Sequence, residues 1–132
     1  MKIFIDTNVL ISAFVFGGTA GKLFELLFDN GFELLVSEYV DKEFKDKLEL
    51  KWPDKASTVY EMYRTLPIKF CESTKKLFGT LRDKKDIPVL SDAMFNNADI
   101  ILSGDKDFLE SDIENPLIFS PKMLLDFLME KE

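Results

Sequence analysis

The sequence predicts an α/β fold built on a central parallel sheet of four to five strands. Two observations lead to this prediction: short apolar runs recur along the chain, and most are followed by a segment whose apolar residues repeat at helical spacing. Strands that alternate with helices are joined by crossovers and therefore form parallel sheets. The 132 residues are 46% hydrophobic and include 13 phenylalanines, which suffices for a single domain over residues 1–132.

The first element is a strand over Lys2–Ile5, an apolar run that stops at the polar triplet Asp6-Thr7-Asn8. Residues 9–15 are predicted to be helical, and the glycines of Phe16-Gly17-Gly18 end that helix. Helical spacing returns between Leu23 and Phe28, and Asn30-Gly31 is a typical signal for the end of such a helix.

Residues 32–36 form the second predicted strand, and Ser37 is a favoured N-cap for the helix after it. Val40, Phe44 and Leu48 share one face of that helix. The helix ends before Trp52-Pro53, a further helix is predicted over 54–66, and a short third strand over 68–70. No clear pattern marks residues 72–85.

Asp86 precedes Pro88, a residue suited to a first helical turn, and a helix is predicted from there to about Asn97. Residues 100–102 and 116–119 are the last two predicted strands. Ser120-Pro121 then opens a final helix over 123–129.

Composition excludes several kinds of chemistry. The chain contains no histidine, which excludes histidine general bases, Ser-His-Asp and Cys-His nucleophiles, and most zinc sites. The single cysteine has no partner for an internal disulfide, and the longest nearly apolar run, Val9–Phe16, is far shorter than a membrane span. A signal peptide is not expected, because a single lysine precedes Asp6. We therefore expect a cytoplasmic protein that does not enter a membrane.

The net charge of −7 argues against nucleic acid as a ligand, because simple electrostatic binders of nucleic acid are usually basic. The exception is a protein whose acids gather in a metal site, where bound divalent ions reverse the local field. Ten cations are candidates for phosphate contacts, although solvated surface is the commoner explanation: Lys42, Lys45, Lys47, Lys51, Lys55, Lys75, Lys76, Arg82, Lys84 and Lys85.

Carboxylates stand where parallel α/β proteins bind ligands. Asp6 follows the first predicted strand and Asp105 follows the strand over 100–102, so both are expected at the carboxyl edge of the sheet. Joined by Glu43 and Asp86, they form an oxygen-ligand set for Mg²⁺, and two such ions hydrolyse phosphodiesters without histidine. The competing interpretation is that these acids only cap helices, a role that suits Asp86.

Neighbouring acids compete for two of these positions. Glu38 and Asp41 lie close to Glu43 in the sequence. Asp92 lies six positions after Asp86 in the same helix and therefore points elsewhere.

Taken together, the motifs resemble the PIN-domain family, and most closely its prokaryotic members regarded as toxins of toxin–antitoxin systems (VapC-like). The resemblance runs from the first strand to the last helix, except for about residues 50–76. Its motifs are Phe4-Ile5-Asp6-Thr7-Asn8-Val9-Leu10, Phe16-Gly17-Gly18, Leu35-Val36-Ser37 with Glu43-Phe44, Asp83-Lys84-Lys85-Asp86-Ile87-Pro88-Val89-Leu90 with Ala98-Asp99, Ser103-Gly104-Asp105-Lys106-Asp107-Phe108, and Ser120-Pro121.

The resemblance implies a Rossmann-like three-layer α/β/α fold and an Mg²⁺- or Mn²⁺-dependent endoribonuclease. It makes Asp6, Glu43, Asp86 and Asp105 the catalytic metal ligands. Asp107 is a fifth candidate. Three polar residues would orient ligands or water: Thr7, Asn8 and Ser103. Asp83 is a second-tier ligand that competes with Asp86, because the third segment is poorer in aspartate here than in relatives. Asp92, which points elsewhere, is also second-tier.

The expected partners are an RNA substrate, a small antitoxin protein whose basic residues suit the acidic surface, and a second copy of the chain. Phe14, Phe16 and Phe24 are candidates for a partner groove, with core packing as the ordinary explanation. Alternatives are a non-catalytic PIN-fold module that binds RNA or protein, and a phospho-receiver-like signalling domain. A receiver needs an acidic pair after the first strand, and a haloacid-dehalogenase-type phosphatase needs an aspartate where Asn8 stands.

Overall fold

The computed structural model of the chain has a single five-stranded sheet in the order β3-β2-β1-β4-β5, and every neighbouring pair of strands is parallel. It describes residues 1–77, 81 and 84–130. The α/β prediction is confirmed, with five strands: β1 (Lys2–Ile5), β2 (Glu33–Ser37), β3 (Ile68–Cys71), β4 (Ile100–Leu102) and β5 (Leu117–Phe119).

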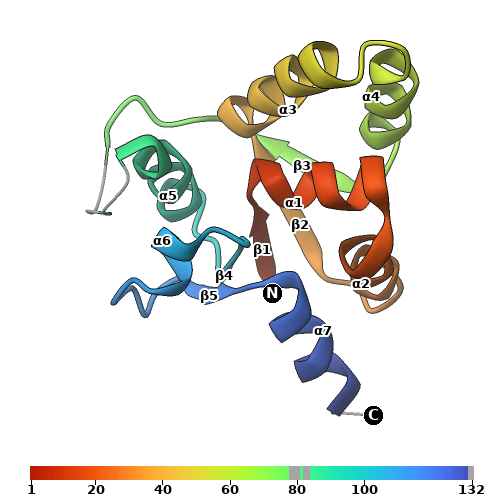
Figure 1. Cartoon of the computed structure of the whole chain (residues 1–132). Helices are drawn as coiled ribbons and strands as arrows, with labels where there is room; N and C mark the ends of the chain where they lie inside the picture. The colour runs from red at the N-terminus through yellow and green to blue at the C-terminus, as the bar shows by residue number, and fades with distance from the viewer. Residues whose placement is uncertain (78–80, 82–83, 131–132) are drawn as a thin grey trace.

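Helices surround the sheet. Right-handed crossovers place the helices before β3 on one face and those between β3 and β5 on the other, and Figure 1 shows α5 and α6 separated from α1 and α2 by β1. The helical elements are α1 (Thr7–Ile11), η1 (Ser12–Phe16), α2 (Gly18–Asp29), α3 (Glu38–Lys51), α4 (Ala56–Arg64), η2 (Lys84–Asp86), α5 (Ile87–Phe95), α6 (Lys106–Leu109) and α7 (Pro121–Glu130).

The central strand β1 fixes the position of the site. Its residues Ile3, Phe4 and Ile5 are fully buried, as expected for an apolar strand that is covered on both faces of a parallel sheet. Ile5 pairs with Leu102 of β4. Because the two strands end in register, Asp6 and Ser103 emerge side by side at the carboxyl edge.

The glycine signals around α2 act as predicted. Gly17 has φ +77° and Gly18 has φ +57°, a region that glycine enters without steric cost, and the chain turns there between η1 and α2. At the other end, Gly31 has φ +74°, and the amide of Phe32 donates to the carbonyl of Leu27. This Schellman motif ends the helix.

Among the described residues, no single helix is long and apolar enough to cross a membrane. Residues 7–16 and 18–29 pass such a test only as a pair, and the pair is bent by 99°.

Several element boundaries differ from prediction. The first helix begins at Thr7 rather than at residue 9, because Asp6 caps it, and its second half is a π-helical turn. The helix predicted over 54–66 is shorter, Ala56–Arg64. The short helix α6 was not predicted. Arg82 and Asp83 lie outside the described residues.

Candidate metal centre

Asp6 is the buried member of the site, with 6% of its surface exposed. Its Oδ1 accepts the Thr7 amide at 2.8 Å, and its Oδ2 accepts the Ser103 hydroxyl at 2.8 Å. Burial raises the pKa of Asp6, the two hydrogen bonds oppose that rise, and the charges of Glu43 and Asp105 add to it. The carboxylate of Asp6 is thus oriented by two hydrogen bonds, and a nearby positive charge would stabilise its ionised form.

Ser103 links Asp6 to the next acid. The Ser103 hydroxyl, fully buried, also accepts the amide of Asp105 at 3.1 Å. One hydroxyl therefore fixes the side chain of Asp6 and the backbone of Asp105 relative to each other. The sequence pointed to Ser103 as an orienting residue, and this geometry suits that role.

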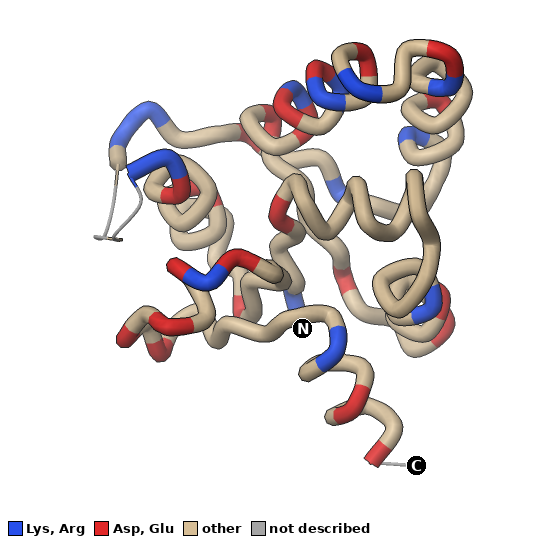
Figure 2. Tube along the Cα trace, in the orientation of Figure 1, with Lys and Arg blue, Asp and Glu red and all other residues tan. Residues whose placement is uncertain are grey.

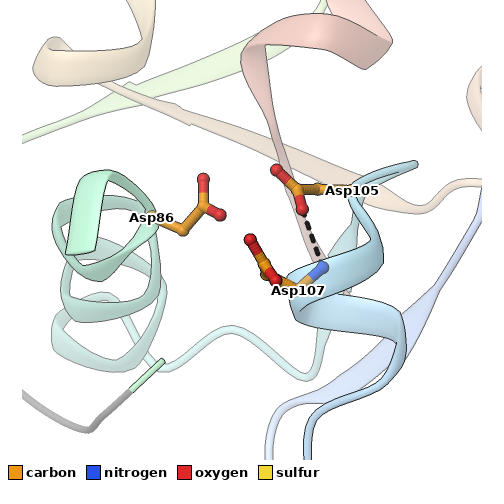
Figure 3. Close-up of side chains that lie close together, drawn as sticks. All are labelled: Asp86, Asp105 and Asp107. Atoms are coloured by element: carbon orange, nitrogen blue, oxygen red, sulfur yellow. Dashed lines mark hydrogen bonds between the residues drawn. The ribbon is translucent and has the colours of Figure 1, made fainter. Parts of the chain in front are cut away.

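Asp105 also belongs to a group of three carboxylates that face one another. One oxygen from each of Asp86, Asp105 and Asp107 lies within 4.8 Å of the other two. Figure 3 shows Asp86 at the start of α5 turned toward Asp105 and Asp107 at the start of α6. All three are half-buried. Such an all-oxygen set, able to leave room for water, fits Mg²⁺ or Mn²⁺.

Helix capping accounts for only part of this arrangement. Asp105 Oδ1 accepts the Asp107 amide at 2.8 Å and so caps α6, as Asp6 caps α1. Asp86 stands at the N-cap of α5, but in the described structure its side chain makes no capping hydrogen bond. The prediction that Asp86 suits a capping role is wrong, because its carboxylate is directed at the two other aspartates.

The second acid comes from α3. Glu43 is half-buried and close enough to Asp6 for its charge to raise the pKa of Asp6. Its competitor Asp41 faces α4 instead, where it accepts hydrogen bonds from Tyr60 at 2.9 Å and Tyr63 at 2.8 Å. Glu38 is exposed.

Tyr39 lies among the acids, and no pattern in the sequence pointed to it. Burial raises the pKa of its hydroxyl, and the charges of Glu43, Asp86 and Asp6 raise it further. The residue is 37% exposed. A partly exposed aromatic residue therefore lies close to the acids of the site.

Asp92 does not join the cluster. It is 1% exposed, and it accepts the Ser73 hydroxyl at 2.7 Å and the Thr74 amide at 2.9 Å. Ser73 Oγ in turn accepts the amide of Tyr39 at the start of α3. Asp92 thus ties α5, which follows Asp86, to α3, which carries Glu43. Ser73 lies in the stretch without a readable pattern, so the sequence could not reveal this link.

Two further polar residues flank Asp6. Asn8 is exposed, and its Oδ1 accepts the Lys47 ammonium at 3.3 Å. The buried Thr7 Oγ1 has no hydrogen-bond partner among the described residues. A buried hydroxyl without a protein partner, next to Asp6, fits a site that takes a polar ligand such as water or a hydrated ion.

The surroundings of the cluster differ in charge on its two sides. A cavity of about 630 Å³ lies beside Asp107, and Leu90, Met94 and Ile113 supply its apolar surface. Its acidic lining residues are Asp107, Glu110, Asp112 and Glu114. On the other side, a groove of about 290 Å³ runs along α3, and its lining holds two lysines and two acids, Lys42, Lys47, Glu43 and Asp46. Figure 2 shows red and blue segments alternating along α3, blue segments just before α5, and mostly red segments in and after α6.

Comparison with known proteins agrees with this arrangement. A family model described as PIN domain matches residues 2–107. A comparison with curated proteins gave no match. Among solved structures, a chain of the crystal structure of VapBC2 from Rickettsia felis, bound to a DNA fragment from its promoter, is similar with a TM-score of 0.69.

That similarity covers 91% of this chain and 98% of the other, at 14% sequence identity, and it supports the fold. The family model covers most of the 132 residues and includes Asp6, Glu43, Asp86 and Asp105. The chain therefore belongs to the PIN-domain family.

Proposed function

We propose that this protein is an Mg²⁺- or Mn²⁺-dependent endoribonuclease and the toxin component of a toxin–antitoxin pair. The observation that carries the proposal is the convergence of Asp86, Asp105 and Asp107 within 4.8 Å, next to the buried Asp6 at the carboxyl edge of the sheet. Membership of the PIN-domain family supports the same class of activity.

Each acid has a task in this proposal. Asp86, Asp105 and Asp107 would hold the divalent ions, with Asp6 and Glu43 completing the ligand set. Bound there, the ions would activate water and stabilise the leaving oxygen of a phosphodiester. Ser103 and Thr7 hold Asp6 by hydrogen bonds, so its carboxylate is oriented before the substrate arrives.

The direct test uses purified protein and labelled single-stranded RNA, with DNA of the same sequence as a comparison. We expect cleavage of RNA with Mn²⁺ or Mg²⁺ and none with EDTA. Asp6→Asn should bind RNA but not cleave it. A wild-type protein that binds Mn²⁺ and RNA without cleaving would favour a non-catalytic module, and labelling by acetyl phosphate would favour a receiver domain.

For the partner, we propose a small antitoxin with basic residues. The acidic cavity beside Asp107 suits such residues. A hollow of about 490 Å³ lined by Phe14, Phe24 and Met62 provides apolar surface. Phe24 itself is buried, whereas Phe16 is 71% exposed against Trp52.

Co-expression with the small protein encoded beside its gene, followed by measurement of the mass of the complex, tests the antitoxin. Sedimentation of the chain alone tests the homodimer, which stays a prediction, as does the cytoplasmic location.

A further inference from the structure

One face of α3 forms a groove that leads away from the carboxylates. Its lining residues recur at three- and four-residue intervals and so lie on one stripe of the helix: Tyr39, Lys42, Glu43, Asp46, Lys47 and Leu50. The groove is shallow, with a volume of about 290 Å³. Besides the acids Glu43 and Asp46, it has an aromatic ring, an apolar side chain and two lysines. Aromatic rings beside cations bind single-stranded nucleic acid.

The groove is continuous with the proposed metal centre, because Glu43 belongs to both. Tyr39 precedes Glu43 by one helical turn and Lys47 follows it by one turn, so each is displaced about 6 Å along the axis. A phosphate held at the acids would therefore have a ring on one side and an ammonium on the other.

Lys47 is the cation placed for a phosphate contact. Its Nζ donates to the neutral amide oxygen of Asn8, two residues after Asp6. Lys42, in contrast, is paired with Asp46 at 2.9 Å. The charge of Lys47 is thus held at the mouth of the site by a contact that does not neutralise it.

Tyr39 is placed for stacking. The residue is 37% exposed, and its backbone amide donates a hydrogen bond to Ser73 Oγ at 2.9 Å. Ser73 is itself held by the buried Asp92. The backbone that carries the ring is thus anchored, which limits the positions that the ring can take.

The opposite side of the site is unfavourable for an RNA strand. Besides Asp107, which the proposed function assigns to the metal ions, the cavity there is lined by Glu110, Asp112 and Glu114, whose charges would repel phosphates. In the sheet order, α3 follows β2 and α6 follows β4, so the two grooves lie on either side of β1 and Asp6. An RNA strand bound at the acids is therefore directed toward α3.

We infer that this face of α3 is the subsite for a nucleotide next to the cleaved bond, with its base stacked on Tyr39 and its phosphate bound by Lys47. The inference rests on the proposed ribonuclease function and names the residues that position its substrate. The class of ligand is single-stranded RNA, with stacking rather than base-edge hydrogen bonds as the main contact.

The test compares four variants with wild type: Tyr39→Leu, Tyr39→Phe, Lys47→Gln and Lys47→Arg. Tyr39→Leu and Lys47→Gln should raise KM for a single-stranded RNA oligonucleotide roughly tenfold and change kcat by less than about twofold. Tyr39→Phe and Lys47→Arg should behave as wild type. Lys122→Gln on α7 is the matched control, since Lys122 is an exposed lysine outside the groove.

Two readouts separate stacking and charge from a general loss of structure. RNA binding is measured by fluorescence anisotropy in the presence of Ca²⁺. In Lys47→Gln the slope of the logarithm of the binding constant against the logarithm of salt concentration should be smaller in magnitude by about 0.7, the value for one phosphate of a single strand. When the oligonucleotide has an abasic residue beside the cleavage site, Tyr39→Leu and wild type should bind it equally well. Melting temperatures and Mn²⁺-induced shifts should be the same in all variants.

Equal KM and equal salt slope in wild type, Tyr39→Leu and Lys47→Gln would overturn the inference. So would variants that bind RNA normally but fail to bind a protein partner, because the groove would then be a protein interface. If wild type does not cleave RNA, the proposed function fails, yet the anisotropy series with Ca²⁺ still decides whether this groove binds RNA.

Discussion

Crowded carboxylates should destabilise the metal-free protein, and Asp105→Asn measures that cost. The substituted asparagine would keep the cap on α6, because its side-chain oxygen can still accept the Asp107 amide. Its amide group would replace one carboxylate oxygen of the cluster with a hydrogen-bond donor to the remaining acids. The substitution therefore removes like-charge repulsion without removing the local structure.

The distances set the size of the effect. Two unit charges 4.8 Å apart repel by about 0.9 kcal/mol in water and by about 3.5 kcal/mol at an effective dielectric constant of 20. Because the three side chains are only half-buried, solvent screening keeps each pair near the lower value. Asp105 has two such neighbours, so Asp105→Asn should stabilise the metal-free protein by about 2 kcal/mol, which raises Tm by roughly 5 °C or more.

Metal should reverse the order of stability. At a hundredfold excess over Kd, Mn²⁺ stabilises wild type by about 2.7 kcal/mol. A tenfold weaker site in Asp105→Asn gives only about 1.4 kcal/mol at the same concentration. Melting curves with EDTA and with Mn²⁺ measure both effects. Asp126→Asn, the same change on the exposed side of α7, is the control and should show neither.

Two results would refute this reasoning. Equal Mn²⁺ shifts in wild type and Asp105→Asn would remove Asp105 from the metal centre. A metal-free Asp105→Asn that melts below wild type would show that the three carboxylates do not repel one another to a significant extent.

Four further outcomes follow from the contacts of single acids. Asp6→Asn should abolish divalent-dependent cleavage while the circular dichroism spectrum stays native, and an active mutant would contradict the proposed site. Since burial raises the folded pKa of Asp6 above its ordinary value of 3.8, the folded state holds this proton more tightly than the unfolded chain. Metal-free stability should therefore fall as pH rises from about 4 through the raised pKa, and the fall should be smaller in Asp6→Asn. In a crystal soaked in Mn²⁺, anomalous density should lie beside Asp86 and not beside Asp92. Asp92→Ala should cost about 3 kcal/mol in urea unfolding, because Ser73 and Thr74 lose bonds to a charged acceptor, and a cost below about 1 kcal/mol would argue against the anchoring role.

The sequence determined the strands and the positions of the strand-end acids. Periodicity identifies β1 and β4 because buried parallel strands are short unbroken apolar runs. Asp6 and Asp105 directly follow such runs, so their place at the carboxyl edge needs only the rule that parallel strands end at the same side. The glycines around α2 were readable for a similar reason, since positive φ angles restrict the choice of residue.

Helix boundaries and short helices were harder to predict from the sequence. The start of α1 depends on the bond between Asp6 and the Thr7 amide, and α6 has only four residues, too few for a periodic pattern. Such elements are decided by caps and by packing.

Only the tertiary structure decided which acids meet. Glu38, Asp41 and Glu43 lie on the same helix and look equivalent in the sequence, but Asp41 is occupied by Tyr60 and Tyr63 of α4. Asp92 is a second-tier ligand in the sequence analysis, and the structure shows it buried against Ser73. These assignments depend on contacts between residues that are far apart in the sequence, for which local periodicity carries no information. The grouping of Asp86 with Asp105 and Asp107 is of the same kind, because it depends on how α5 and α6 are placed at one edge of the sheet.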